Sequence, residues 1–131
     1  MQLGNFSVSL AVKSLAASRT FYEAIGFSVI GGDAEQKWLI LRNDGAIIGL
    51  FEGMFEQNIL TFNPGWDQGG GELGQFEDIR DLQRRLRERG IQIVSEADDS
   101  SDGPASMILA DPDGNTILID QHVPRPQRSR S

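Results

Sequence analysis

Cysteine is absent from the chain, and this absence excludes several kinds of chemistry at once. With no cysteine among its 131 residues, the protein has no disulfide, no thiolate metal site and no cysteine nucleophile. Histidine is nearly absent too, since it occurs once, as His122. A lone histidine without an evident nucleophile is a weak sign of catalysis.

Basic residues are also few. Twelve lysines and arginines against nineteen acidic residues give a net charge of −7. We therefore expect no nucleic-acid partner, because binding to phosphates needs a basic surface. The arginines of residues 79–90 alternate with acids, a pattern typical of a solvated helix face with ion pairs. An acidic protein favours cationic ligands.

Long apolar runs are missing as well. No run reaches the length of a membrane span, so we expect no membrane partner. The first eighteen residues lack the charged start of a signal peptide, and Lys13 interrupts their apolar part, so we expect a cytoplasmic protein. The length fits a single domain, and the apolar content of 39% suits a packed core.

The order of predicted elements occurs twice. The alternating residues 6–12 predict a half-buried strand, Ser14 caps a helix that ends at Gly26, and residues 27–52 predict three more strands. In the second half, residues 71–77 form a poor strand by propensity, Asp78 caps an amphipathic helix, and three strands follow. The two helices are equally long, and each half contains an Asp-Gly turn.

A βαβββ unit present twice explains this order. We predict one α+β domain over residues 1–131. Its parts are a first module at 4–53, a linker at 54–70, a second module at 71–123 and a flexible tail at 124–131. The linker contains Phe55, Phe62 and Trp66. These aromatic residues either pack on the sheet or form a lid or a dimer contact.

Two stretches resemble a known family. "FSVSLAVKSLAASRTFYEAIGF" and "ADPDGNTILI" resemble the opening and closing segments of the vicinal oxygen chelate superfamily. This superfamily includes glyoxalase I, extradiol dioxygenases, fosfomycin-resistance enzymes and bleomycin-binding proteins. The resemblance covers about residues 4–123. It implies two βαβββ modules whose curved mixed sheet forms a cleft, commonly within a homodimer, and a metal that acts as a Lewis acid in the family's enzymes.

The resemblance also implies the positions of the metal ligands. These positions are Ser7, Gly49, Gly71 and Leu118, and Leu118 stands where the metal enzymes have a glutamate. Zinc, nickel, manganese and iron need imidazole or carboxylate donors, usually three or more. Glycine and leucine side chains donate nothing, so we expect neither a metal at this site nor another cofactor.

Strand alternation predicts which side chains share the face of these positions. It gives Ser7, Ser9, Phe51, Gln75, Glu77, Leu118, Asp120 and His122 as candidate ligand-binding residues, and Trp66 joins them as a linker residue after a turn, at the mouth of the cleft or at an interface. Apolar walls with a few polar groups suit a small organic ligand. Asp120 would raise the pKa of His122 and could orient it as a base, unless both lie at a solvated rim or dimer contact. Trp38 either stacks a planar ligand or packs in the core.

Three functions remain open. We favour a small-molecule-binding protein that lacks the family's metal ligands. The alternative is a lyase or dioxygenase that uses metal-free acid–base chemistry, or a metal relocated to Asp120 and His122 with Glu77 or Glu52. The third is an interaction module whose cleft is filled. The sequence assigns no catalytic residue and does not identify the ligand.

Overall fold

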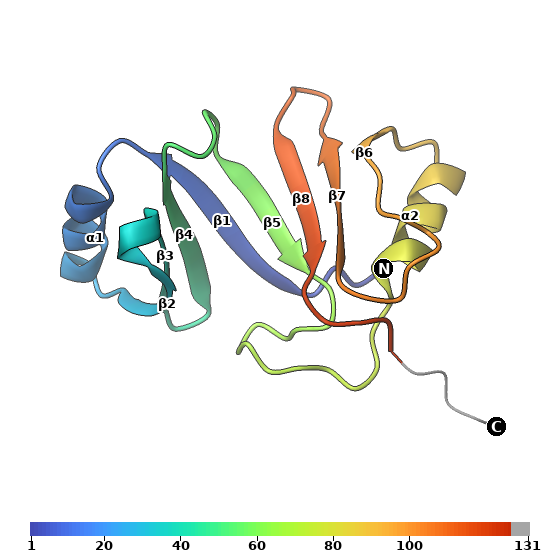
Figure 1. Cartoon of the computed structure of the whole chain (residues 1–131), viewed down its shortest axis with the longest axis horizontal. Coiled ribbons are helices and arrows are strands. Elements are labelled where there is room, and N and C mark those ends of the chain that lie inside the picture. Colours follow the sequence, from blue (N-terminus) through green and yellow to red (C-terminus); the bar gives the residue numbers. More distant parts are fainter. Residues whose placement is uncertain (127–131) are drawn as a thin grey trace. The chain divides into compact units, whose positions relative to one another are not determined.

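The computed structural model describes residues 1–126, and Figure 1 shows the arrangement of the elements within each unit. The described elements are β1 (Asn5–Val12), α1 (Leu15–Ala24), β2 (Ser28–Asp33), the 3-10 helix η1 (Ala34–Gln36), β3 (Trp38–Asn43), β4 (Ala46–Glu52), β5 (Ile59–Asn63), α2 (Ile79–Glu88), β6 (Ile93–Ser95), β7 (Ala105–Ala110) and β8 (Thr116–Gln121). They confirm the predicted α+β class. The chain divides into two compact units, which we call the N-terminal unit (7–60) and the C-terminal unit (1–6 and 61 onward).

The N-terminal unit contains strands in the order β2-β3-β4-β1, with β1 parallel to β4 and the other neighbours antiparallel. Alternation along β1 directs Leu10 and Val12 toward α1, where they pack against a buried core. That core consists of Leu15, Leu39, Leu41 and Leu50. The Oγ atom of Ser14 accepts the amide of Ala17, as the predicted cap requires.

The C-terminal unit has the corresponding order β5-β8-β7-β6, with β7 antiparallel to both β8 and β6. Its helix α2 begins after Asp78, whose side chain accepts the amide of Arg80. The helix contacts β7 and β8 through a core of Ile79, Leu82, Met107, Leu109 and Ile119. Both units therefore have the predicted βαβββ order.

The first strand of the C-terminal unit lies earlier in the chain than predicted. The strand expected at 71–77 is wrong, because Glu72 makes only an isolated bridge with Trp66 there. Strand β5, inside the predicted linker, takes its place. Its sequence "ILTFN" has the β-branched and aromatic residues that favour strands, whereas "ELGQFED" is rich in glycine and acids. A loop over residues 64–78 then leads to α2.

Part of the expected flexible tail is anchored. The amide of Arg125 donates to the carbonyl of Asp102 at 2.8 Å, and the Arg125 side chain pairs with Asp102 at 3.3 Å. Residues 127–131 of the expected tail lie outside the described residues. Neither α-helix of residues 1–126 is long and apolar enough to cross a membrane.

Candidate functional site

In each unit, strand alternation directs one set of side chains away from the helix. We call the surface that they form the far face of that unit. In the N-terminal unit, Ser9 of β1 lies beside Gly49 of β4, which in turn lies beside Ile40 of β3. Ser7, Ser9 and Phe51 all belong to this face by alternation, as predicted. Ser9 and Gly49 are buried there, and Ser7 and Phe51 are half-buried.

Aromatic rings occupy much of the far face of the N-terminal unit. The rings of Trp38 and Phe51 are parallel within 3°, with centroids 6.1 Å apart, and Phe55 lies 5.4 Å from Phe51. Trp38 is half-buried and pairs with Phe51 across β3 and β4, so it does not belong to the core beneath α1. A row of flat apolar surfaces of this kind suits a planar ligand.

The ring of Phe51 covers Gly49, one of the four positions implied for the metal. A Cβ atom at Gly49 would lie 2.5 Å from Cε2 of Phe51 and 3.2 Å from Cδ1 of Ile40. A carboxylate side chain could enter this position only if the Phe51 ring moved. Together with Ser7, this part of the face offers no imidazole or carboxylate, so it does not fit a transition metal.

We expect the Gly49→Ala variant to displace the Phe51 ring and to lower the free energy of unfolding by about 1–3 kcal/mol, as overpacking does. Urea unfolding measures this loss, and the fluorescence of Trp38 should change because its stacking partner moves. Gly45→Ala is the control, since no atom lies within 4 Å of a Cβ at Gly45. An unchanged stability and spectrum in Gly49→Ala would contradict the close packing.

In the C-terminal unit, the far face carries Leu118 and Asp120 on β8. Across the antiparallel pair, Leu118 lies beside Ile108 and Asp120 beside Ser106 of β7. Asn63, buried at the end of β5, donates its Nδ2 hydrogen to the carbonyl of Asp120 at 2.8 Å. The implied glutamate position therefore holds leucine beside isoleucine, an apolar surface without a metal donor.

Trp66, Asp120 and His122 come together at the edge of this face. The Nε2 atom of His122 lies 3.2 Å from Oδ2 of Asp120. The imidazole is parallel to the indole of Trp66 within 5°, with ring centroids 4.6 Å apart. The hydrogen bond to Asp120 raises the pKa of His122 above its usual 6.5, although partial burial opposes the shift. A protonated His122 is then held between a carboxylate and an aromatic face.

We expect the Asp120→Asn variant to lower the pKa of His122, because the main cause of the upward shift is removed while partial burial remains. A folded-state pKa above the usual value means that the pair stabilises the fold fully below pH 6.5, and that this stability is lost as pH rises through the raised pKa. An NMR titration of the single histidine measures the shift. An equal or higher pKa in the variant would contradict this assignment.

Three predicted site residues lie elsewhere. Gly71, Gln75 and Glu77 are in the loop over 64–78, so the alternation that placed them beside Leu118 does not apply. Gly71 donates its amide to Oδ1 of Asp67. Glu77 pairs with Arg85 of α2 at 2.6 Å. Sequence reasoning missed Asn63 of β5, which binds the carbonyl of Asp120, although its place next to apolar Phe62 was a usable signal.

The alternative metal donors are also engaged. Glu52 accepts the amide of Leu15 at 2.8 Å and pairs with Lys37 at 3.4 Å. The Leu15 bond, together with Lys37, lowers the pKa of Glu52. Among residues 1–126, no group of three or more histidine, aspartate or glutamate side chains is arranged to hold a metal ion. The donors therefore do not fit the relocated metal considered for Asp120 and His122.

A cavity of about 310 Å³ lies on the α1 side of the N-terminal unit. Leu15 and Leu39 contribute its apolar lining, and Lys37 and Glu52 contribute charges. Because these charges pair with each other and with the start of α1, they serve the local fold. Five of the candidate ligand-binding residues belong instead to the far faces: Ser7, Ser9, Phe51, Leu118 and Asp120.

The chain belongs to the Glyoxalase/Bleomycin resistance protein/Dioxygenase superfamily, whose family model matches residues 6–119. This membership confirms the resemblance and the fold class. Among curated protein sequences, none matches the chain significantly.

Solved structures show the same fold at low sequence identity. A superfamily member from Vibrio splendidus 12B01 is 17% identical, with a TM-score of 0.62 over 89% of this chain and 97% of that one. The methylmalonyl-CoA epimerase of Streptomyces coelicolor is 18% identical, with a TM-score of 0.58 over 92% and 99%. The Mn(II)-bound glyoxalase of Novosphingobium aromaticivorans is 18% identical, with a TM-score of 0.55 over 95% and 41%.

Proposed function

We propose that the protein binds a small planar organic molecule and that binding does not depend on a metal. The observation that carries this proposal is the ring of Phe51, which stacks on Trp38 and covers Gly49. Where the resemblance implies a metal ligand, the N-terminal unit thus has an aromatic surface. Leu118 supports the same conclusion in the C-terminal unit, because it replaces a donor with an apolar side chain.

A cationic ligand suits the charges. The net charge of −7 raises the local concentration of cations near the protein. Aromatic faces such as that of Trp38 attract cations through the ring quadrupole. We therefore propose a planar organic cation as the ligand class.

The test is a binding titration after exhaustive dialysis against a chelator. N-Methylquinolinium serves as the cationic probe and quinoline as its neutral analogue, each followed by calorimetry. We expect the cation to bind more tightly, and the Trp38→Ala variant to bind it about tenfold more weakly through the loss of stacking and buried area. Phe21→Ala is the control, because Phe21 is an exposed aromatic residue of α1.

Three results would count against this function. One is the absence of binding to every member of a broad panel of planar cations. Another is binding that chelation abolishes and added Mn²⁺ or Zn²⁺ restores. The third is stoichiometric transition metal in protein purified without chelator, lost in the His122→Ala variant.

Metal-free acid–base catalysis is the second candidate function, and the His122–Asp120 pair favours it. A carboxylate that binds Nε2 orients the imidazole, so that neutral His122 could accept a proton at Nδ1. Deuterium exchange from solvent into dihydroxyacetone, followed by NMR, tests this activity. If His122 is the base, the exchange rate should rise as His122 loses its proton and should disappear in His122→Ala.

Association into a homodimer also stays a prediction, which light scattering would check.

A further inference from the structure

Gln121, between Asp120 and His122 in the sequence, points to the opposite side of the sheet. It is the last residue of β8, and its exposed fraction is 0%. Its Oε1 atom accepts the amide of Ile79 at 2.8 Å, and its Nε2 atom donates to Oδ1 of Asp78 at 2.8 Å and to the carbonyl of Val123 at 3.0 Å. The acceptor and both donor hydrogens of this buried amide can therefore be satisfied.

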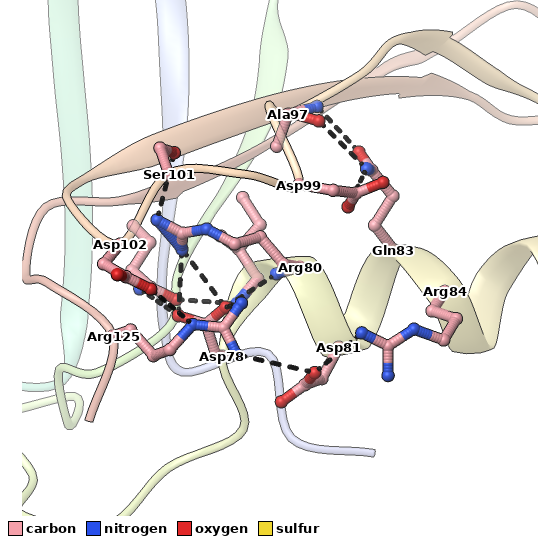
Figure 2. Close-up of polar contacts among 12 residues, drawn as sticks. Asp78, Arg80, Asp81, Gln83, Arg84, Ala97, Asp99, Ser101, Asp102 and Arg125 are labelled. Atoms are coloured by element: carbon pink, nitrogen blue, oxygen red, sulfur yellow. Dashed lines mark hydrogen bonds and ion pairs between the residues drawn. The ribbon is translucent and has the colours of Figure 1, made fainter. Parts of the chain in front are cut away.

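The carboxylate of Asp78, to which Gln121 donates, is itself held by a buried arginine. Asp78 is 2% exposed and Arg80 is 0% exposed, and Nη1 of Arg80 donates to both carboxylate oxygens of Asp78 at 3.0 and 3.1 Å. Figure 2 shows this pair at the start of α2, with Arg125 and Asp102 beside it. Gln121 thus joins the end of β8 to the buried Asp78–Arg80 ion pair at the start of α2.

His122 lies just beyond the ladder of β8, which ends one residue earlier. Gln121 pairs with Ala105 of β7, and no strand pair includes His122. The side-chain bond from Gln121 to the carbonyl of Val123 spans the backbone of His122. On the far face, the same backbone carries the imidazole that stacks on Trp66.

We propose that Gln121 is a positioning residue of the far face of the C-terminal unit, which holds His122 on Trp66 and beside Asp120. For ligand binding, this inference rests on the proposed function. A side chain fixed in its binding geometry before the ligand arrives spares the entropy of ordering it during binding. Gln121 acts through His122 and needs no contact with the ligand.

Gln83 provides a matched control. It is another glutamine with an exposed fraction of 0% in the C-terminal unit. Its Oε1 atom accepts the amide of Ala97 at 2.7 Å, and its Nε2 atom donates to the carbonyl of Ala97 and to Asp99, both at 3.1 Å. Figure 2 shows these bonds on α2, where they fix the segment after β6. The Gln83→Met and Gln121→Met variants lose similar bonds.

The experiment observes the imidazole protons of His122 by NMR, which is unambiguous because the chain has one histidine. The ring current of Trp66 should shift these protons upfield in the unmodified protein. In Gln121→Met, we expect the upfield shift to be lost, because the imidazole is no longer held on the indole of Trp66. In Gln83→Met, stability should fall similarly while the upfield shift is kept.

The outcomes separate the two proposals. A folded Gln121→Met variant that keeps the upfield shift overturns the positioning role, and so does an equal loss of the shift in Gln83→Met. If the shift changes as expected but the unmodified protein does not bind N-methylquinolinium, the proposed ligand class fails and the positioning of His122 stands.

Two further measurements test the proposal if the Gln121→Met variant does not fold. Gln121→Glu keeps the volume and the acceptor for Ile79 but loses the donors to Asp78 and to the carbonyl of Val123, and it brings a second carboxylate beside Asp78, so in its folded form it should also weaken the upfield shift. In the unmodified protein, urea should abolish the upfield shift and the exchange protection of the Ile79 amide with the same free energy of opening. Loss of the shift at lower urea, with Ile79 still protected, would overturn the proposal.

Discussion

Replacing Arg80 with methionine (Arg80→Met) is expected to lower the free energy of unfolding by about 3–5 kcal/mol. Arg80 and Asp78 are buried together, with exposed fractions of 0% and 2%. Removal of the guanidinium leaves the carboxylate of Asp78 in a poorly solvated position, and it also breaks the Arg80 bonds to Gly103 and Ser101. Arg125 offsets part of this loss, since its Nη2 atom lies 3.6 Å from Oδ2 of Asp78. Urea unfolding followed by circular dichroism measures the loss.

Arg84→Met is the matched control on the same helix. The side chain of Arg84 is 63% exposed and pairs with Asp81 at 3.3 Å, so its loss should cost less than about 1 kcal/mol. The double variant Asp78→Asn with Arg80→Met should recover much of the stability, because asparagine keeps the helix cap without the buried charge. Equal losses in Arg80→Met and Arg84→Met would show that the buried pair is not the source of the stability.

The helices were predictable because their signals are local. Ser14 and Asp78 cap α1 and α2 as the sequence indicates, and the apolar residues Ile79 and Leu82 of the amphipathic helix α2 face the core. The strand before α2 was not predictable by the same argument. The equal length of the two helices suggested an equal spacing of strand and helix in both modules. A long loop between β5 and α2 breaks that spacing, so the strand signal of "ILTFN" lies outside the predicted position, and pairing with distant β8 identifies it as the equivalent strand.

The candidate site was predictable where alternation alone determines it. Asp120 and His122 share a face because they lie two residues apart in an extended chain. The stack of His122 on Trp66 was not predictable, since Trp66 lies in the loop after β5 and no period governs a loop. Gln121 left a usable signal. A polar residue where alternation expects an apolar one needs buried hydrogen-bond partners.

Replacing Gly65 with alanine (Gly65→Ala) is the second variant with a large expected effect, about 2–5 kcal/mol of unfolding free energy. Gly65 has φ of +95°, which alanine adopts only with strain. A Cβ atom there would also overlap Cγ2 of Val123 and lie 3.2 Å from Cζ of Phe76. Because Trp66 follows Gly65 and His122 precedes Val123, the overlap pushes apart the two segments that carry the stacked rings.

Gly90→Ala separates the two causes. Gly90 has φ of +79° in the same unit, but no atom lies within 4 Å of a Cβ there. This control should lose only the backbone contribution of about 1–2 kcal/mol and should leave the imidazole protons of His122 shifted upfield. Gly65→Ala should lose more stability and also move those protons toward their unstacked position. If Gly65→Ala matched Gly90→Ala in both measurements, the contact of the 64–78 loop with Val123 would not hold the Trp66–His122 stack together.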